Sequence, residues 1–410
     1  MKFGLESITR LCGAMDHPER AFRSVLIAGT NGKGSVTVMV ETALRAAGYR
    51  AARYTSPHLV RVEERFVVDG AEIDTEALRD ALGLVQHTVE RLLQDRALEA
   101  PPTFFECTTA VAFELFRRAA VDIAVLEVGL GGRLDATNVV TPVVAAITSI
   151  DFDHQALLGD TIASIAREKA GIIKRDAPVV CGPLPPEAEN VIRGACEERG
   201  ARMVRAFDEV QIIERVDSGG LDVRTTTRVL TEMRLALSGR HQRDNAAVAV
   251  AVLEELARAG LTIPDAAIRE GLTGAAWPGR LERFQLGDTE ILLDAAHNRA
   301  GARALAAHLR EIGWTGVTLI FGAMRDKDAR GMLDALAPLC ASIVCTTAPS
   351  PRAMPAADLA LVASGIPSMA GRTDAVGDPG AALEHARRTG RRVVAAGSIF
   401  LIGPLRDILR

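Results

Sequence analysis

A lysine stands inside a run of glycines in the stretch VLIAGTNGKGSVTV, residues 25–38. Glycines tolerate positive φ and let backbone N–H groups close around an anion, and a helix that follows adds the positive end of its dipole. The cation, Lys33, would neutralise terminal phosphates, and the hydroxyl of Ser35 could bind phosphate or its magnesium ion. The alternative is a strand-to-helix turn with a solvated lysine. Because strand, glycines, Lys, Ser and helix occur together, the stretch predicts a phosphate-binding loop.

The spacing of this loop differs from the common phosphate-loop pattern G-x-x-x-x-G-K-[ST]. The first glycine of that pattern would fall on Ile27, and Gly34 separates the lysine from the serine. The loop still offers glycines, a cation and a hydroxyl between a strand and a helix, so we expect it to hold a nucleotide. The residues predicted to contact the nucleotide here are Gly29, Thr30, Asn31, Gly32, Lys33, Gly34 and Ser35.

A second set of polar residues follows apolar runs farther along the chain. Glu127 ends the run VDIAVLE, where a buried carboxylate is costly unless it is paired, and a metal ion is a natural partner. His154 follows the run VVAAITSI, and it is either a core histidine with satisfied hydrogen bonds or a ligand of the same metal. The glycines of GLGGRLD lack the spacing of a dinucleotide-binding fingerprint, so we reject that interpretation.

An adjacent pair of phenylalanines occurs in PTFFECTTA, residues 102–110. The chain has only 12 phenylalanines, two tryptophans and two tyrosines, so an adjacent pair favours a functional interpretation. Aromatic rings of this kind can stack on a flat heterocycle. The other interpretation is an ordinary helix N-terminus, because Glu106 suits the positive end of a helix. From the residues alone, both interpretations stay open.

Strands and helices that alternate along the chain must position these residues. The runs SVLIAG, VDIAVLEVG and VVAAITSI are continuous and rich in β-branched residues, as strands covered on both faces should be. Between them, segments such as VTVMVETALRAAG and TIASIAREKAG carry helical periodicity and end at glycine. This alternation predicts an α/β fold with a mostly parallel, P-loop-type sheet flanked by helices.

The stretch from Val210 to Leu237 has a different pattern. Its polar and apolar residues alternate and are interrupted by a Gly-Gly pair at 219–220, which predicts a small antiparallel β insert. A helix follows, and then WPGRLERF brings turn residues at which we place the domain boundary. We therefore predict a nucleotide-binding domain over 1–280 and a smaller Rossmann-like α/β domain over 281–410. The strands expected in the second domain are TEILLDAAHN, GVTLIFG, SIVCTT and RRVVAAG.

Composition narrows the class of protein. Of 410 residues, 48% are hydrophobic and 24% charged, and the net charge is −4 without a basic block, so we expect no nucleic-acid partner. No apolar stretch approaches membrane-spanning length, and the first ten residues lack a signal-peptide core. The six cysteines are scattered without CxxC pairs, which is typical of a reduced cytoplasmic protein without structural zinc. We expect a cytoplasmic monomer.

The loop GTNGKGS resembles that of the Mur ligase superfamily, ATP-dependent enzymes that join a carboxylate to an amine. Its asparagine and Gly34 are similar to those of folylpolyglutamate and dihydrofolate synthases. The resemblance covers nearly the whole chain, and the order and spacing of its motifs make it specific. Further stretches that carry it are YTSPHL, PTFFECTTA, VLEVGLGGRLDATN, DFDHQALLGDTIASIAREKAGIIK, GRHQRDNAAVAVA, WPGRLERF, LDAAHNRAG, AMRDKD and AAGSIFLIG.

This resemblance implies a magnesium site. Ser56 of SPHL, which alone would be an ordinary Ser-Pro turn, helps to hold magnesium in the family, and Glu127 binds it. The resemblance also makes His154 a ligand and Lys169, in REKAGI, a carbamylated lysine whose new oxygens bind the metal. A surface lysine in a helix ion pair is the alternative for Lys169.

It also implies further contacts with the substrates. Asn245, Arg280 and Asp294 match residues that contact ATP, and His297 matches a residue placed for the γ-phosphate or the incoming amino acid. In the family, the TFFE motif lines the pocket for the pterin end of the substrate. Its residues in this chain are Thr103, Phe104, Phe105 and Glu106.

The implied activity is formation of an amide between a folate-type carboxylate and L-glutamate through an acyl phosphate. Lys33, Lys169 and His297 would be catalytic, and the cofactors would be ATP, two Mg²⁺ ions and a monovalent cation. Relatives usually begin with a further short helical segment, so we expect either that this element is absent or that the given start is late, which leaves dihydropteroate, folyl-glutamates or both as acceptors. The alternatives are a Mur-type ligase for a UDP-sugar peptide, which usually has a GKTT-type loop and no TFFE, and a non-ligating ATPase switch.

Overall fold

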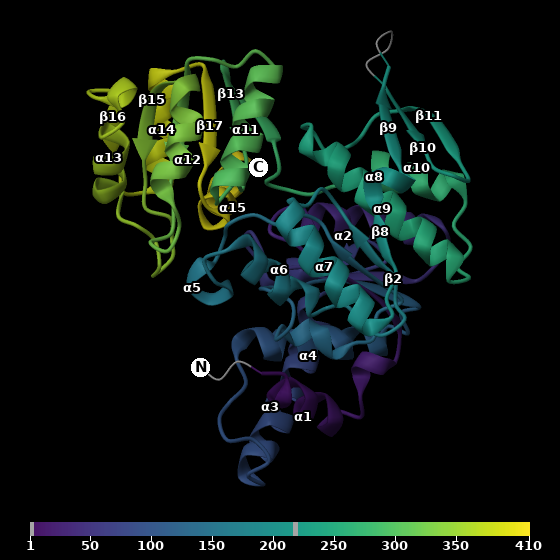
Figure 1. Ribbon diagram of the computed structural model, residues 1–410. Helices are drawn as coiled ribbons and strands as arrows, with labels where there is room; N and C mark the ends of the chain where they lie inside the picture. Colours follow the sequence, from purple (N-terminus) through teal and green to yellow (C-terminus); the bar gives the residue numbers. More distant parts are fainter. Residues whose placement is uncertain (1–3, 216–219) are drawn as a thin grey trace. The chain divides into compact units, whose positions relative to one another are not determined.

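The computed structural model describes residues 4–215 and 220–410. The chain divides into two compact units (Figure 1), Met1–Ala236 with Gln242–Ala276, and Leu237–His241 with Trp277–Arg410. The functional domains expected over 1–280 and 281–410 stay a prediction.

An eight-stranded sheet forms the centre of the first unit, in the order β4-β3-β2-β5-β1-β6-β7-β8. All neighbouring strands from β2 to β8 pair in parallel, and only β3 and β4 are antiparallel. This confirms the mostly parallel sheet expected from the β-branched runs. The strands are β1 Arg23–Ala28, β2 Ala51–Tyr54, β3 Phe66–Val68, β4 Ala71–Glu72, β5 Ile123–Glu127, β6 Val144–Ile147, β7 Val179–Cys181 and β8 Met203–Arg205.

Helices cover both faces of this sheet, as their connections between parallel strands require. Helix α2 packs on β2 and β5 and is covered in turn by α10, while α3 packs on α4 and α6 on α7. The helices are α1 Glu6–Ala14, α2 Lys33–Ala46, α3 Thr75–Gln94, α4 Phe104–Arg118, α5 Gln155–Leu158, α6 Ile162–Ala170, α7 Pro186–Arg199, α8 Ala206–Glu209, α9 His241–Arg258 and α10 Asp265–Thr273. Short 3₁₀ turns lie at η1 Pro18–Arg20, η2 Val62–Arg65 and η3 Ala136–Val139.

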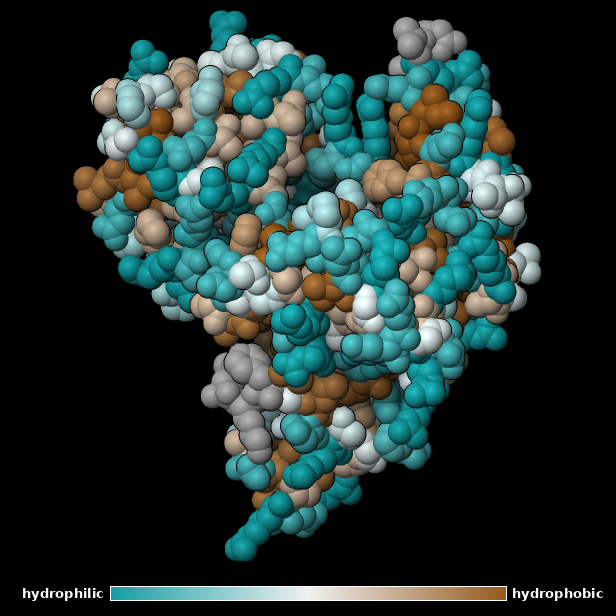
Figure 2. Space-filling view, viewed as in Figure 1, coloured by the Kyte–Doolittle hydropathy of each residue, from teal (hydrophilic) through white to brown (hydrophobic). Residues whose placement is uncertain are grey.

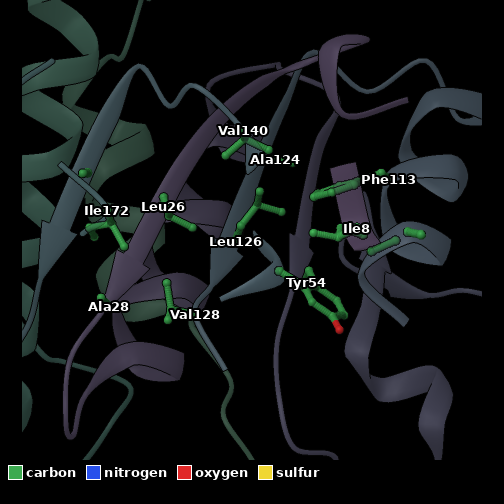
Figure 3. Packing of buried hydrophobic residues seen from close by; sticks show 14 of the residues in the cluster. Ile8, Leu26, Ala28, Tyr54, Phe113, Ala124, Leu126, Val128, Val140 and Ile172 are labelled. Carbon is green, nitrogen blue, oxygen red and sulfur yellow. The ribbon is translucent and has the colours of Figure 1, made fainter. Parts of the chain in front are cut away.

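One hydrophobic core of this unit lies between the sheet and one of its helical layers (Figure 3). Leu26 of β1 pairs in register with Leu126 of β5, and both side chains are fully buried. Tyr54 of β2, Phe113 of α4 and Ile8 of α1 belong to the same cluster. Each fully buried large apolar side chain contributes roughly 1.5–3 kcal/mol, so this layer fixes the strands whose ends carry the polar residues.

The antiparallel insert predicted between Val210 and Leu237 is confirmed as a three-stranded sheet in the order β11-β10-β9. Of the Gly-Gly pair that suggested its turn, Gly219 lies outside the described residues. The strands are β9 Gln211–Glu214, β10 Leu221–Arg224 and β11 Val229–Met233.

The second unit has a six-stranded sheet in the order β12-β13-β17-β14-β15-β16, parallel except for the hairpin of β12 and β13. Leu319 of β14, Val394 of β17 and Met332 of α12 are buried together in its core. The Rossmann-like sandwich is thereby confirmed. Its strands are β12 Glu282–Leu286, β13 Thr289–Leu293, β14 Val317–Phe321, β15 Cys340–Cys345, β16 Thr373–Ala375 and β17 Arg392–Ala396. Its helices are α11 Arg299–Glu311, α12 Ala329–Leu336, α13 Ala356–Ser364, α14 Pro379–Thr389 and α15 Ile399–Leu409, with 3₁₀ turns η4 Ala337–Leu339 and η5 Pro367–Met369.

The surface is mixed in polarity. Figure 2 shows hydrophilic residues over much of the visible face, with small hydrophobic areas between them. Across the described ranges, none of the helices has both the length and the apolar character that crossing a lipid bilayer demands.

Candidate active site

The glycine loop joins the end of β1 to the start of α2, as the sequence predicted. Gly32 has φ 87°, and no side chain caps the helix that it begins, so the N–H groups of the first turn face outward for an anion. Lys33 Nζ lies 3.2 Å from the carbonyl oxygen of Gly29. A Cβ on Gly32 would lie only 2.3 Å from Oδ1 of Asn245, which brings the predicted nucleotide residue Asn245 against the loop.

The segment after β6 holds this loop in place. The N–H of Thr30 donates to the carbonyl oxygen of Ser149 at 2.8 Å, and the N–H of Asn31 donates to Ser149 Oγ at 3.0 Å. Thr148 Oγ1 donates to the carbonyl oxygen of Asn31 at 2.5 Å. Sequence analysis did not single out Thr148 and Ser149, although two hydroxyl residues directly after a buried strand are a usable signal. Thr148 and Ser149 fix the backbone of the loop in the absence of a ligand.

Strand pairing brings Lys33, Glu127 and Ser56 together. Glu127 ends β5 beside Ile27 of β1, and its side chain is buried. Glu127 Oε1 lies 3.9 Å from Lys33 Nζ, and Oε2 accepts a hydrogen bond from the N–H of Ser56 at 3.3 Å. The cation expected to hold phosphate and the carboxylate expected to hold a metal thus share one site.

Lys169 is buried in α6, with 4% of its surface exposed. In the ranges 4–215 and 220–410 its ammonium group forms no hydrogen bond or ion pair. Burial, together with the nearby charge of Lys33, lowers the pKa of Lys169 to about 7, while Asp153 and Asp135 act in the opposite direction. A buried amine that is about half neutral at neutral pH, next to the phosphate-binding cation, is unusual for a structural lysine.

The glycine-rich turn after β5 positions α6 and Lys169. A Cβ on Gly132 would lie 2.9 Å from the carbonyl oxygen of Glu168 and 3.0 Å from that of Lys169. The Asn138 side chain donates to the carbonyl oxygens of Arg133 and Gly171, each at 3.1 Å. These contacts clamp the turn to the C-terminal end of α6. Asn138 therefore shapes the loop.

His154 lies beside Asp153 in the segment between β6 and α6. Its Nε2 is 3.9 Å from Asp153 Oδ1, and its backbone N–H donates to the same oxygen at 2.8 Å. Asp153 is close enough to Lys169 to affect its pKa. The structure thus places His154 and Lys169 near a common carboxylate.

The donor atoms test whether a magnesium site fits. The buried Glu127 carboxylate and the Ser56 hydroxyl are oxygen donors, which Mg²⁺ prefers. Over the part of the chain that is described, no three residues among His, Cys, Asp and Glu are grouped as a metal site. Magnesium is commonly held by one or two protein oxygens together with substrate phosphates and water, so the Glu127 carboxylate and the Ser56 hydroxyl fit such a site.

The TFFE motif begins α4, and its two polar residues cap the helix. Thr103 Oγ1 accepts from the N–H of Glu106 at 3.2 Å, and Glu106 Oε2 accepts from the N–H of Thr103 at 2.7 Å. Phe105 lies against Tyr54, with ring centroids 6.0 Å apart, whereas Phe104 is 63% exposed. The motif therefore has both features considered from the sequence. Thr103 and Glu106 form an ordinary helix N-terminus, and Phe104 presents an exposed aromatic ring.

The remaining predicted residues, Arg280, Asp294 and His297, belong to the second unit. The buried carboxylate of Asp294 accepts from the N–H groups of Leu281 at 3.0 Å and Ala296 at 2.9 Å. His297 Nδ1 lies 3.0 Å from the carbonyl oxygen of Ala295. These contacts place Asp294 and His297 on the segment between β13 and α11.

His241, which sequence analysis did not single out, lies near two of these residues. Burial lowers its pKa; the charge of Asp294 opposes this shift, and those of Arg280 and His308 add to it. Arg280 and Asp294 therefore lie within electrostatic reach of one imidazole.

Two family models match the chain: the Mur ligase middle domain over residues 27–253 and the Mur ligase, glutamate ligase domain over residues 279–399. The dihydrofolate synthase/folylpolyglutamate synthase of Bacillus subtilis is 36% identical, with 100% of this chain and 96% of that protein aligned.

Solved structures agree with these matches. The Mycobacterium tuberculosis folylpolyglutamate synthase complexed with ADP and AMPPCP has a TM-score of 0.93 at 34% identity, covering 99% of this chain and 95% of that one. The bifunctional synthase of Yersinia pestis complexed with AMPPNP and Mn has a TM-score of 0.87 at 31% identity, covering 100% and 94%. The chain therefore belongs to the Mur ligase family, in its branch of folylpolyglutamate and dihydrofolate synthases.

Proposed function

We propose that the protein is an ATP-dependent ligase that joins a folate-type carboxylate to the amine of L-glutamate. The observation that carries this proposal is the cluster of Lys33, Glu127 and the buried Lys169 at one end of the parallel sheet. A phosphate-binding loop alone would serve any nucleotide enzyme. A buried amine with a lowered pKa and a buried carboxylate, both near Lys33, suit a metal-assisted transfer of a phosphoryl group.

The loop from Gly29 to Ser35 would bind the phosphates of ATP, with Lys33 neutralising the charge that grows on the transferred group. Asn245, Arg280 and Asp294 would contact the rest of the nucleotide. The complexes of relatives with ADP, AMPPCP and AMPPNP support a nucleotide as substrate.

We propose Mg²⁺ as the metal, with two ions held by the phosphates, Ser56, Glu127, His154 and a carbamylated Lys169. When bound, magnesium would supply Lewis-acid stabilisation of the phosphoryl oxygens. The Mn ion in the Yersinia pestis structure supports a divalent cation. We propose a monovalent cation as a further cofactor.

Carbamylation of Lys169 requires an uncharged amine. With a pKa of about 7, about half of the side chains would be neutral at neutral pH. The nitrogen lone pair then attacks carbon dioxide, a C–N bond forms, and a proton leaves to solvent. The product carries a negative charge on oxygen, which suits a hard cation and relieves the burial of a positive charge.

The reaction would proceed in two steps. A carboxylate oxygen of the acceptor attacks the γ-phosphorus of ATP, the bond to the bridging oxygen breaks, and ADP leaves an acyl phosphate. The amine of L-glutamate then attacks the acyl carbon, loses a proton and expels inorganic phosphate. Lys33 would steady the phosphoryl oxygens in the first step, and His297 would contact the γ-phosphate or the amino acid.

The acceptor would bind along TFFE. The exposed ring of Phe104 offers a face for a flat heterocycle, while Phe105 is fixed against Tyr54. Thr103 and Glu106 would act here chiefly by holding the start of α4. Such a surface is compatible with dihydropteroate as the acceptor, with folyl-glutamates, or with an enzyme that uses both.

The test compares acceptors. Purified protein with ATP, Mg²⁺ and L-glutamate should release phosphate only when dihydropteroate or a reduced folate is added. Release with a UDP-sugar peptide instead would identify a cell-wall type ligase, and release independent of acceptor and glutamate would identify an ATPase switch. Either result would overturn the proposal.

We also propose a monomer in the cytoplasm. All six cysteines are free thiols, which suits a reducing compartment. Light scattering of the purified protein tests the oligomeric state.

A further inference from the structure

Thr30, in the glycine loop, gives both of its hydrogen-bond donors to the segment that follows β6. The residue is buried, with 7% of its surface exposed. Its N–H donates to the carbonyl oxygen of Ser149 at 2.8 Å, and its hydroxyl donates to the carbonyl oxygen of Asp151 at 3.1 Å. A threonine has one N–H and one O–H, so in this arrangement neither donor is left for a phosphate oxygen.

The same hydroxyl also accepts a hydrogen bond from Asp151. The N–H of Asp151 donates to Thr30 Oγ1 at 3.1 Å, so one side-chain oxygen binds both backbone polar groups of that residue. Each of these bonds is modest in energy, but together they satisfy the backbone of Asp151 and fix its orientation. Thr30 therefore holds Asp151 against the glycine loop without adding a charge there.

From Asp151 the chain leads directly to the proposed metal ligand His154. The carboxylate of Asp151 accepts from the N–H of Phe152 at 2.7 Å, and that of Asp153 accepts from the N–H of His154 at 2.8 Å. His154 itself has φ 50°, in the left-handed region. Because local side-chain bonds fix both steps, the position of the imidazole follows the position of Asp151. Thr30 thus anchors the start of the segment that ends in His154.

The next residue of the loop, Asn31, is held by separate contacts. Its N–H donates to Ser149 Oγ at 3.0 Å, and its carbonyl oxygen accepts from Ser149 Oγ at 3.1 Å and from Thr148 Oγ1 at 2.5 Å. These bonds remain when the hydroxyl of Thr30 is removed. The backbone of the loop and the segment leading to His154 can therefore be disturbed separately.

We propose that the side chain of Thr30 is a positioning residue for the metal site, which holds His154 in place and does not itself bind phosphate. This rests on the proposed function and deepens it, because it divides the loop between two tasks. Thr30 sets the metal ligand, whereas residues 32–35 face the nucleotide. Removing a group that orients a metal ligand typically lowers metal affinity by about 10- to 100-fold.

Thr30→Val tests this, since it keeps the shape of the side chain and removes both hydrogen bonds to Asp151. Two dissociation constants are measured on the full chain. Calorimetry in EDTA gives the Kd of AMPPNP without metal, and electron paramagnetic resonance gives the Kd of Mn²⁺ for the complex with AMPPNP, corrected for Mn²⁺ bound by AMPPNP alone. Thr30→Val should raise the Kd of Mn²⁺ roughly 10-fold and leave that of AMPPNP within about twofold. Thr30→Ser, which keeps the hydroxyl, should bind Mn²⁺ nearly as wild type does.

Thr37→Val is the matched control. Thr37 is a fully buried threonine of α2, and its hydroxyl has no hydrogen-bond partner in the described part of the chain. Its replacement should change neither Kd. His154→Ala completes a double-mutant cycle, because Thr30→Val should no longer raise the Kd of Mn²⁺ once the ligand that it positions is missing.

Three results would overturn the assignment. Weaker binding of metal-free AMPPNP by folded Thr30→Val would show that the hydroxyl contacts the nucleotide. An unchanged Kd of Mn²⁺ would show that it positions no metal ligand, and an equal rise in the His154→Ala background would show that it does not act through His154. If Thr30→Val does not fold, Thr30→Ala is measured in the same way. Neither Kd involves an acceptor, so failure of the proposed function, in which wild-type protein releases no phosphate with acceptor and glutamate, is observed separately.

Discussion

The ammonium nitrogen of Lys33 lies 3.9 Å from a carboxylate oxygen of Glu127, where β1 and β5 end side by side. Parallel pairing of Ile27 with Glu127 produces this approach from residues far apart in the sequence. In the absence of ligand the two charges partly neutralise each other. Binding of a nucleotide with its divalent ion would replace that pair with phosphate for the cation and metal for the carboxylate.

Replacing Lys33 by alanine should therefore abolish ligation. Removal of a cation that stabilises developing negative charge typically costs about 10²–10³-fold in turnover, and we expect a loss of at least that size. The measurement is ADP formation under saturating ATP, with thermal unfolding used to verify that the variant is folded. Near-normal turnover in a folded Lys33→Ala protein would contradict the role given to this residue.

Lys169→Ala should lose activity to a similar extent, for a different reason. If the working form of Lys169 is a carbamate, small carboxylic acids such as acetate should partly restore turnover by supplying the missing oxygen donor. Lys174→Ala is the matched control, because burial also lowers the pKa of Lys174 yet its Nζ donates to the carbonyl oxygen of Asn138 at 2.8 Å. That variant should show no rescue. An active wild-type enzyme whose intact mass shows unmodified Lys169 would rule out carbamylation.

The lowered pKa of Lys169 also predicts how stability changes with pH. Between about pH 7 and the unfolded value of 10.5, the unfolded chain binds the proton that the folded chain has lost, so stability rises with pH across this window. Below about pH 7 both states are protonated, and the full cost of burying the charge is present.

Lys169→Met removes this cost. In carbon dioxide-free buffer, the variant should be more stable than wild type at pH 6.5, and the difference should shrink as the pH approaches 10. Denaturant unfolding at several pH values measures this. A difference that stays constant with pH would show that folding does not lower the pKa of Lys169.

Gly132→Ala should destabilise the protein and displace Lys169. The added Cβ would meet the carbonyl oxygens of Glu168 and Lys169 at about 3 Å, and neither backbone atom can move without shifting α6. We expect a loss of about 1–3 kcal/mol in the free energy of unfolding. Gly194→Ala, within α7 and with open space around its Cβ, should instead stabilise by roughly 0.5–1 kcal/mol.

Local patterns predicted much of this fold. The runs that became β1, β5 and β6 are apolar at most positions because helices cover both faces, and that continuity is visible without a structure. β16 spans only Thr373–Ala375, too short for any periodicity, and β12 was taken as part of the turn at WPGRLERF. Both are edge strands whose pairing comes from the sheet rather than from their own residues.

The site was predictable where its residues follow strand ends, as Lys33 and Glu127 do. Sequence reasoning did not find His241, because nothing in GRHQRD indicates that its imidazole lies within electrostatic reach of Arg280 and Asp294. Nor could it foresee that Thr148 and Ser149 hold the glycine loop, since that contact depends on the pairing of β1 with β6. Such contacts depend on which residues of neighbouring strands pair, and the composition of the sequence does not reveal that pairing.

Gly32 and Asn245 come from distant parts of the chain, yet one leaves the space that the other occupies. A library that diversifies residue 32 while retaining asparagine at 245 would consist mostly of clashing members. A smaller residue at 245 would remove the clash but not the strain, because φ 87° at residue 32 disfavours every side chain, so engineering of this loop should leave Gly32 in place and vary residue 245.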